Sequence, residues 1–368
     1  MKFLLIMVSV LILLSSCTKK NDGSTPESAK AGSVIDYEFV TKISPDNNPD
    51  TFTNASKAIA DNNGNIYILD PMKGIYKFDQ DGKFLKMIGS KGSGPGEYNV
   101  CQNIFIVNTS LYALDMMSQK FIKFNLDGQF LEDITGLSSF PVYTSVAGGN
   151  ISGLTFSQSM SDNSIYFIYS IAVMDTLFNE KQTLWKDSVL FDPQNMSNMM
   201  DMGIMAPLFA SGEKFDYFAD KSTDHFLISK FDKEGNKTEI KKGYRRISYT
   251  KEELEEVNAM INKSMEGSGV PDEIAEQMKA KYKYKNAINM VKVDYKGRLW
   301  VQASKEEYTG LEANLNFDIY IDDTLVGTVD MKDEAGNPIK KSDVNFFGDL
   351  IVQNDMDLRE VKVYRFKD

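Results

Sequence analysis

The sequence has a single histidine, His225, among its 368 residues. This scarcity removes most chemistry that depends on pairs of imidazoles, including zinc sites with several histidine ligands. Basic residues are also in the minority, with 41 Lys and Arg against 52 Asp and Glu, and the net charge is −11. Because a chain of this charge is repelled by phosphate backbones, the sequence predicts no nucleic-acid partner.

Cysteine is almost as rare as histidine, with Cys17 and Cys101 as its two occurrences. If the thiol of Cys17 carries a lipid, as the sequence that precedes it suggests (next paragraph), no intrachain disulfide is possible and stability must come from packing. Cys101 precedes the apolar run Ile104 to Val107. We therefore predict a buried side chain at Cys101 rather than a reactive thiol.

The N-terminus carries the most specific signal in the chain. After a positive start, Phe3 to Leu14 form an apolar run that is too short to span a bilayer as a stable helix. Leu14-Ser15-Ser16-Cys17 follows at once and resembles a bacterial lipobox. The resemblance implies cleavage of a signal peptide, residues 1–16, and a lipid on Cys17 that holds the protein on a membrane. An ordinary cleaved signal peptide and a short buried helix are the alternatives.

A repeated strand pattern organises the rest of the chain after a flexible tether predicted for residues 17–32. Ser56 to Gly89 predicts four short antiparallel strands, because Asp-x-x-Gly segments supply tight turns between runs rich in Ile, Tyr and Phe. The pattern at Lys77 to Phe84 recurs at Lys123 to Phe130 and at Lys230 to Asn236. The first two copies lie 46 residues apart, which is typical of a propeller blade, and the later spacings fit about four further blades.

The sequence therefore predicts an all-β fold, a six-bladed β-propeller of four-stranded antiparallel blades over residues 33–368. Val363 to Phe366 aligns with the third strand of the repeat, so the last blade lacks a fourth strand. Val34 to Ile43 alternates polar and apolar residues and has no local partner. We expect this N-terminal strand to complete the last blade and close the ring.

The blade pattern and the glycine-rich segment Gly89 to Tyr98 together resemble the six-bladed propeller lipoproteins of Bacteroidetes, which are related to NHL-repeat and TolB-like propellers. The resemblance covers about Val34 to Asp368. It implies the fold and a lipid-anchored location in the bacterial cell envelope, at the outer membrane. It implies little about function, because propellers host many unrelated activities.

The segment from about 250 to 285 breaks the strand pattern and predicts a helical hairpin insertion. Thr250 and Glu253 form a capping box, and Pro271 is typical of the start of a second helix. Such a pair could cap the channel mouth, dock a partner or decorate the rim of the propeller. A solvated basic face is predicted for four lysines at its end, Lys279, Lys281, Lys283 and Lys285.

Two sets of residues are candidates for contact with a ligand at one end of the channel. The first set, in the glycine-rich segment, is Lys91, Glu97 and Tyr98. That segment lacks the Gly-Lys-Ser/Thr ending and the following helix of a phosphate site, so a crossing between blades is its main interpretation.

The second set lies in the turns between second and third strands and consists of Asp70, Asp115 and Asp355. If these carboxylates converged, they would suit calcium, as in lactonase-type six-bladed propellers. The alternative is that each aspartate only begins a turn.

The function predicted from the sequence is a lipid-anchored binding module, whose loops at one end of the channel hold a peptide, a glycan or an envelope protein. No catalytic residue is predicted and no cofactor beyond the open possibility of calcium. A calcium-dependent hydrolase of lactonase type and a structural subunit of an envelope assembly are the alternatives. For the methionine-rich segment 195–205, the sequence leaves open a packed loop, a partner surface and a copper site.

Overall fold

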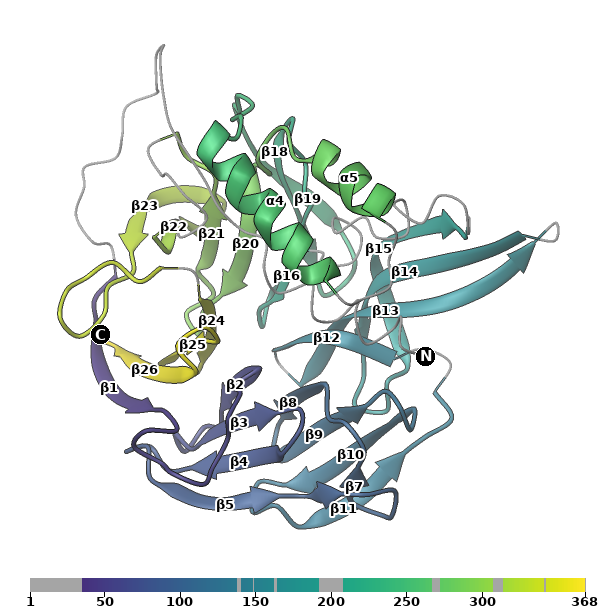
Figure 1. Cartoon of the computed structure of the whole chain (residues 1–368), viewed down its shortest axis with the longest axis vertical. Coiled ribbons are helices and arrows are strands. Elements are labelled where there is room, and N and C mark those ends of the chain that lie inside the picture. The colour runs from purple at the N-terminus through teal and green to yellow at the C-terminus, as the bar shows by residue number, and fades with distance from the viewer. Residues whose placement is uncertain are drawn as a thin grey trace.

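Six four-stranded antiparallel sheets stand around a central axis (Figure 1). The computed structural model describes residues 35–137, 140–147, 149–161, 164–191, 208–266, 272–306, 314–340 and 342–367. The predicted six-bladed β-propeller is confirmed. The predicted signal peptide, the lipidated Cys17, the tether and the methionine-rich segment lie outside the described residues.

Each of blades 1 to 5 consists of four consecutive strands, and its first strand lies innermost. Blade 1 comprises β2 (Lys57–Ala60), β3 (Ile66–Asp70), β4 (Gly74–Phe78) and β5 (Phe84–Ile88). Blade 2 comprises β8 (Asn103–Val107), β9 (Ser110–Asp115), β10 (Lys120–Asn125) and β11 (Phe130–Ile134). Blade 3 comprises β12 (Phe140–Ala147), β13 (Asn150–Ser161), β14 (Ser164–Met174) and β15 (Glu180–Leu190).

The second half of the ring follows the same order. Blade 4 comprises β16 (Leu208–Ser211), β17 (Phe215–Ala219), β18 (Phe226–Asp232) and β19 (Lys237–Lys242). Blade 5 comprises β20 (Ile288–Val293), β21 (Leu299–Ala303), β22 (Asn316–Ile321) and β23 (Thr324–Asp330). Blade 6 comprises β24 (Asp343–Phe347), β25 (Leu350–Asp355), β26 (Glu360–Phe366) and the N-terminal strand β1 (Tyr37–Ile43). A short parallel pair, β6 (Ser90–Lys91) and β7 (Glu97–Tyr98), lies in the crossing between blades 1 and 2.

Tight turns with a common sequence join the strands. In blade 1, Gly64 N donates to Asp61 O at 3.0 Å and Gly82 N donates to Asp79 O at 3.0 Å. Both glycines have a φ of 80°, a left-handed conformation that side chains with a Cβ rarely adopt. The Asp-x-x-Gly segments of the sequence therefore set the hairpins, as predicted.

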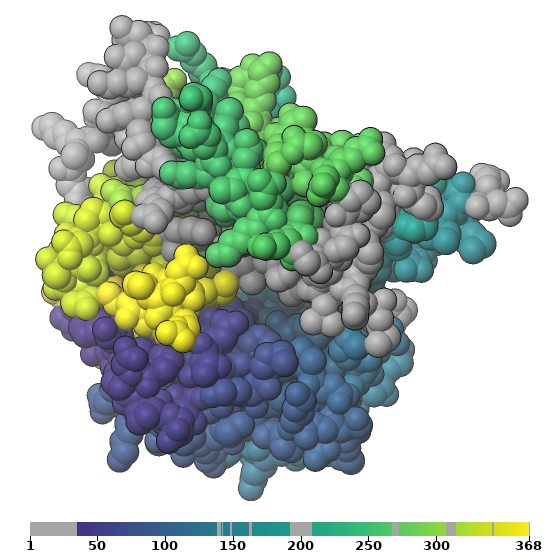
Figure 2. Space-filling model, viewed as in Figure 1, coloured from purple at the N-terminus to yellow at the C-terminus, as the bar shows by residue number. Residues whose placement is uncertain are grey.

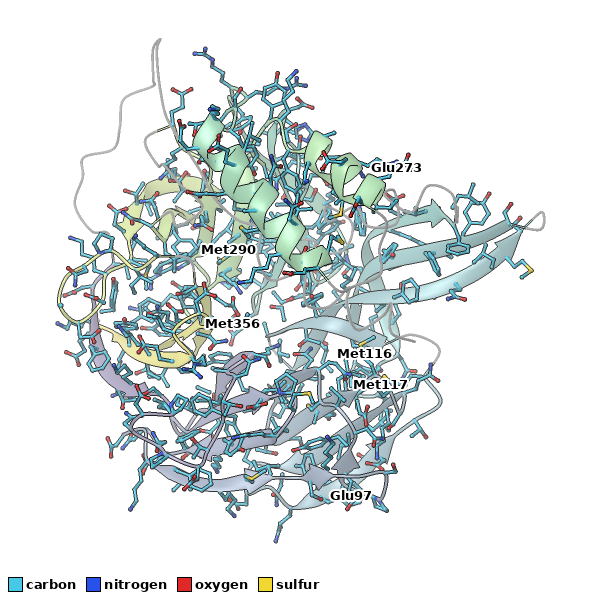
Figure 3. The ribbon with its side chains drawn as sticks, viewed as in Figure 1. Glu97, Met116, Met117, Glu273, Met290 and Met356 are labelled. Carbon is cyan, nitrogen blue, oxygen red and sulfur yellow. The ribbon has the colours of Figure 1, made fainter. Side chains whose placement is uncertain are left out.

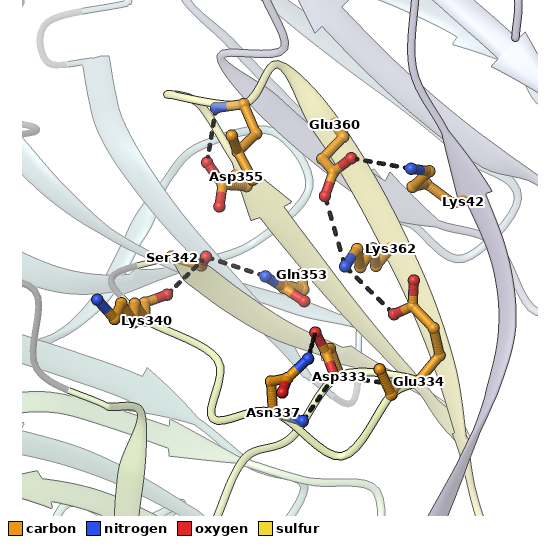
Figure 4. A network of polar contacts seen from close by, with 12 residues as sticks. Lys42, Asp333, Glu334, Asn337, Lys340, Ser342, Gln353, Asp355, Glu360 and Lys362 are labelled. Atoms are coloured by element: carbon orange, nitrogen blue, oxygen red, sulfur yellow. Dashed lines mark hydrogen bonds and ion pairs between the residues drawn. The ribbon is translucent and has the colours of Figure 1, made fainter. Parts of the chain in front are cut away.

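The ring is closed by the two ends of the chain, as expected. β1 pairs antiparallel with β26, from Tyr37 opposite Phe366 to Ile43 opposite Val361. Across this seam the Tyr364 ring contacts Tyr37 and Phe39 edge to face, with centroid distances of 5.6 and 5.9 Å. Figure 4 shows the polar side of the seam, where Lys42 of β1 pairs with Glu360 of β26 at 3.4 Å.

Apolar residues fill the space between neighbouring blades. The innermost strands β2, β8, β12, β16, β20 and β24 contact one another in turn around the ring. Between blades 1 and 2, for example, Tyr67 and Ile75 pack with Ile104 and Phe124. Cys101 belongs to the same cluster and is fully buried, which confirms the prediction, and burial raises the pKa of its thiol to about 12.

Two helices, α4 (Lys251–Met265) and α5 (Asp272–Lys281), form the predicted hairpin between blades 4 and 5. The capping box is present, since Glu253 N donates to Thr250 Oγ1 and Thr250 N donates to Glu253 Oε2. Within the described ranges, neither helix is long and apolar enough to cross a membrane. The pair lies in front of strands of blades 4 and 5 in Figure 1, and in the view of Figure 2 it leaves blades 1, 2 and 6 uncovered by helix.

The prediction of a solvated basic face is wrong for one of its lysines. Lys285 is 1% exposed, and its Nζ lies 3.0 Å from Glu253 of α4, whose side chain is 2% exposed. The buried charge is tolerated because it has a buried partner of opposite sign. The pair fastens the start of α4 to the segment that leads into β20.

Candidate functional site

A continuous channel of about 1530 Å³ runs through the ring and is lined mainly by the innermost strands. Its two ends differ in the connections that surround them. We call the end with the turns between second and third strands and the crossings between blades the crossover mouth. We call the end with the turns between first and second strands the hairpin mouth. Since the helical hairpin connects β19 to β20, it lies on the side of the crossover mouth.

Polar side chains from neighbouring blades meet inside the channel near the crossover mouth. Lys57, the first residue of β2, donates from Nζ to Asn103 Oδ1 of β8 at 2.5 Å. Asn103 Nδ2 donates in turn to Thr144 Oγ1 of β12 at 3.3 Å. All three residues line the channel, so blades 1, 2 and 3 share one chain of hydrogen bonds.

Blades 5 and 6 contribute a second polar group. Lys292 of β20 donates from Nζ to Asn345 Oδ1 at 2.7 Å and to Asp343 Oδ1 at 3.2 Å, both on β24. Asn345 Nδ2 donates to Asp343 Oδ2 at 2.7 Å. Together with Lys57, Asn103 and Thr144 these residues form what we call the polar belt: Lys57, Asn103, Thr144, Lys292, Asp343 and Asn345.

The charges of the belt influence one another. Burial lowers the pKa of Lys57 to about 8, an effect that the attraction of Asp343 opposes and the repulsion of Lys292 adds to. Burial also penalises the Asp343 carboxylate, but attraction to Lys292 and the hydrogen bond from Asn345 outweigh it and lower its pKa. The belt thus holds two amines and one carboxylate. The positive charge of Lys57 is less well balanced than that of Lys292, because the carboxylate of Asp343 is bonded to Lys292.

Methionines border the crossover mouth outside the belt. Met72, Met116, Met117 and Met356 come from the turns between second and third strands of blades 1, 2 and 6, and all four line the channel. Figure 3 places Met116, Met117 and Met356 around the central opening. Met72 is 67% exposed, so this rim offers polarisable, conformationally adaptable apolar surface to a ligand.

The hairpin mouth is different, because acidic residues outnumber basic ones in the channel wall there, and two of the basic residues are ion-paired. Lys230 lies 2.7 Å from Asp323, and Arg298 lies 2.6 Å from Asp294. Apart from Asp343, the acidic residues of the channel wall all belong to turns at this end: Asp61, Glu213, Asp294, Asp322 and Asp323. Among the residues that line the channel, positive charge therefore exceeds negative charge at the crossover end and not at the hairpin end.

The buried hydroxyl of Ser211 adds a further polar group to the channel wall. In the part of the chain that the structure describes, Ser211 Oγ has no hydrogen-bond partner, whereas Ser211 N is satisfied by Ser145 Oγ at 3.0 Å. A buried polar atom without a partner is uncommon in a folded protein. The wall can therefore still offer a hydrogen bond to a molecule inside the channel.

The aspartates predicted as ligand residues fasten loops of their own blades. Asp70 is buried and accepts five hydrogen bonds, from the backbone and hydroxyl of Thr53, and from the backbone of Asn54, Met72 and Lys73. Asp115 repeats this arrangement in blade 2, with Asn99 N at 2.7 Å and Ser118 Oγ at 2.8 Å. Each carboxylate ties the crossing that enters a blade to the turn between its second and third strands.

Replacement of Asp70 by asparagine is expected to destabilise the protein by about 2–3 kcal/mol, because charge-assisted hydrogen bonds are lost and an NH₂ group faces other donors. Burial raises the pKa of Asp70, but the hydrogen bonds from Thr53, Met72 and Asn54 lower it more. The stabilisation is therefore present above about pH 4 and is lost as the pH falls through the lowered pKa.

Denaturant unfolding of the wild type and Asp70→Asn over a range of pH values measures this difference. The control is Asp81→Asn, an exposed turn residue for which a change below about 0.5 kcal/mol is expected. A difference between wild type and Asp70→Asn that grows as the pH falls below 4 would contradict the proposed role of the ionised carboxylate.

The remaining predicted site residues do not meet the aspartates at one point. Asp355 accepts a hydrogen bond from Leu358 N in its own turn (Figure 4), and burial, together with Asp357 and Glu360, raises its pKa. Glu97, the first residue of β7, lies at the outer edge of the ring (Figure 3) and accepts from Gly94 N at 2.9 Å. The described residues contain no group of three His, Cys, Asp or Glu side chains arranged to hold a metal ion.

The glycine-rich segment forms the crossing between blades 1 and 2. Tyr98 is buried there, and its hydroxyl donates to Ile88 O at 2.9 Å and accepts from Ile75 N at 3.3 Å. Gly89 has a φ of 70°, and a Cβ at this position would lie 2.6 Å from the Tyr98 ring. Lys91 is exposed on the crossing. Tyr98 therefore fastens the crossing to β4 and β5 of blade 1.

These features define the chain as a six-bladed β-propeller with a polar central channel. Residues 24–200 match the model of the DUF5128 family, which is described as a 6-bladed beta-propeller. In the structure this stretch contains the strands of blades 1 to 3 and the N-terminal strand of blade 6. The match supports membership of a propeller family.

The solved structures that this chain matches are distant in sequence. A member of the DUF4221 family from Bacteroides vulgatus is 9% identical with a TM-score of 0.45, over 90% of this chain and 98% of that one. An auxiliary nutrient binding protein from Bacteroides thetaiotaomicron is 11% identical with a TM-score of 0.41, over 90% and 76%. A streptogramin B lyase is 10% identical with a TM-score of 0.38, over 84% and 78%. The comparison with curated proteins gave no match.

Proposed function

We propose that this protein is a lipid-anchored binding module of the bacterial cell envelope, which holds a peptide, a glycan or a partner protein at the crossover mouth of its channel. The polar belt is the observation that carries the proposal. It brings charged and amide groups from blades 1, 2, 5 and 6 into a channel whose mouth is bordered by methionines. Ligand sites commonly combine an apolar lining with a few polar groups that fix orientation.

The proposed anchor is the lipid on Cys17, at the end of the lipobox-like Leu14-Ser15-Ser16-Cys17. One acyl-modified residue and a tether over residues 17–32 would leave the propeller free to turn at the membrane surface. We place the protein at the outer membrane. A full chain that is recovered with the soluble proteins after lysis without detergent would contradict this part of the proposal.

Blocking the channel is expected to abolish binding. In the variant Thr144→Trp the indole would occupy the space beside Asn103 and Lys57, so affinity for a ligand is expected to fall at least about tenfold. Isothermal calorimetry of the detergent-solubilised full chain, with short peptides and with envelope oligosaccharides, measures the effect. Thermal unfolding of each variant checks that the ring is intact.

The matched control is Lys83→Trp, which places the same side chain at an exposed turn on the outside of blade 1. We expect this variant to bind like the wild type. Equal binding by Thr144→Trp and the wild type would place the ligand site elsewhere. Analysis of the ligand after incubation with calcium tests the hydrolase alternative, since an unchanged ligand supports a binding module and a cleaved one supports the enzyme.

A further inference from the structure

The crossover end of the channel has more positive than negative charge. The polar belt contributes Lys57, Lys292 and Asp343 to this end. Asp343 attracts the Lys57 ammonium, but its ion pair is with Lys292. An ammonium group has three N–H donors. Within the described residues, the hydrogen bond that Lys57 makes goes to the neutral amide of Asn103. The group best placed to complete this arrangement is an anion.

The residues around the crossover mouth limit which kind of ligand could carry that anionic group. The methionine rim, formed by Met72, Met116, Met117 and Met356, lies outside the belt at the same end of the channel. Thioether side chains adapt their shape to apolar groups of varied outline. Since the whole chain carries a net charge of −11, a ligand with many negative charges would be repelled, and a single anionic group is favoured.

The channel wall also offers amide groups at this end. Asn54 and Gln102 line the channel in addition to the two amides of the polar belt, Asn103 and Asn345. Side-chain amides both donate and accept hydrogen bonds, which matches the N–H and C=O groups of a peptide backbone. Asn103 and Asn345 are already bonded within the polar belt, and Gln102 Oε1 accepts from Met116 N. The amide of Asn54 and the NH₂ group of Gln102 are therefore the groups that a peptide backbone would contact and that a fatty acid would not use.

We infer that the crossover mouth binds the C-terminal carboxylate of a peptide with apolar last residues, with Lys57 as the cation that holds the carboxylate. The inference rests on the proposed function and names its ligand class. The carboxylate accepts hydrogen bonds from Lys57, the last side chains pack against the methionine rim, and the backbone contacts the amides of the wall.

The inference has a specific pH dependence. The groups that act on Lys57 are Asp343, Lys292 and the buried thiol of Cys101, and burial lowers the Lys57 pKa to about 8. A bound carboxylate favours the charged amine and raises that pKa, so binding takes up a proton above pH 8. Affinity is expected to be constant below pH 7 and to fall about tenfold between pH 7 and pH 9.

The experiment uses the detergent-solubilised full chain and the peptide acetyl-Ala-Leu-Leu, with either a free carboxylate or a C-terminal amide. At pH 7 the acid is expected to bind at least about tenfold more tightly than the amide. In Lys57→Met the two forms are expected to bind equally. In Lys57→Arg the preference for the acid is expected to persist, and the fall in affinity toward pH 9 to disappear, because a guanidinium stays charged.

Lys83→Met, at the exposed turn of blade 1, is the matched control and is expected to behave as the wild type. Equal binding of acid and amide by the wild type, or a preference that survives in Lys57→Met, overturns the inference. Octanoate that binds in a Lys57-dependent way when neither peptide does overturns it in favour of a fatty acid. If oligosaccharides bind and Thr144→Trp abolishes that binding, the proposed function stands although the peptide inference falls.

Discussion

Replacement of Glu253 by alanine is expected to destabilise the protein by about 3–5 kcal/mol, the cost of leaving one charge of a buried ion pair without its partner. The Lys285 ammonium lies 3.0 Å from the Glu253 carboxylate, and the two side chains are 1% and 2% exposed. Glu253 also completes the capping box of α4, so the variant weakens the helix start as well. Chemical denaturation followed by circular dichroism measures the loss.

Glu255→Ala is the matched control on the same helix. Its carboxylate pairs with Lys251 at 3.4 Å, but these side chains are 68% and 85% exposed, so a change below about 0.5 kcal/mol is expected. The double replacement Glu253→Met with Lys285→Met removes both charges and is expected to recover most of the lost stability. Equal destabilisation by Glu253→Ala and Glu255→Ala would show that the buried pair does not fasten the hairpin.

The second large effect is expected at the seam of the ring. Tyr364 of β26 is 1% exposed, its ring packs on Tyr37 and Phe39 of β1, and its hydroxyl bonds to Gln353 Oε1 at 3.1 Å. Tyr364→Ala would leave a cavity between the two ends of the chain and is expected to cost about 3–5 kcal/mol. Hydrogen exchange at the β1 amides is expected to accelerate, because the strand loses its main apolar contact.

Glu38→Ala serves as the control for the seam. Glu38 is an exposed residue of β1 whose carboxylate lies 3.6 Å from Lys367, so a change within about 0.5 kcal/mol is expected. If Tyr364→Ala unfolded with the same free energy as Glu38→Ala and left β1 exchange unchanged, the seam would contribute little to the closure of the ring.

The fold was predictable because the sequence pattern that specifies each blade is short and recurs along the chain. The turn that joins the first two strands of blade 1, with Asp61 and Gly64, recurs at Asp294 and Gly297 in blade 5. The partner of β1 was predictable for a different reason: an alternating segment without a nearby partner pairs best with a sheet that lacks a strand. Both arguments use patterns that a single sequence displays.

The polar belt was not predicted, because its residues belong to different blades. All but Thr144 leave a weak signal in the sequence, a charged or amide side chain in an innermost strand, such as Lys57 before Ala58 and Ile59, or Lys292 between two valines. Convergence of these residues depends on the ring, and no spacing along the chain encodes it. The partner of Lys285 was missed for the same reason, since Glu253 lies 32 residues earlier.

For the aspartates predicted as ligand residues, the sequence located the turns correctly but did not show which groups the carboxylates contact. Asp70 and Asp115 occupy the expected turns, but Asp70 reaches back to Thr53 and Asn54 in the segment that precedes its blade. A carboxylate that begins a turn and one that binds a ligand have the same local sequence. The difference depends on which donors lie around it in space.

The pairing of Tyr37 with Phe366 also sets the order in which the molecule can be completed. A nascent chain leaving the ribosome could assemble blades 1 to 5 in succession, but blade 6 needs both the earliest strand and the latest one. Until β26 emerges, β1 has no partner and the interfaces of the first and fifth blades with blade 6 are missing. Contacts this distant in sequence form slowly, so closure of the ring should be the final, rate-limiting stage of maturation.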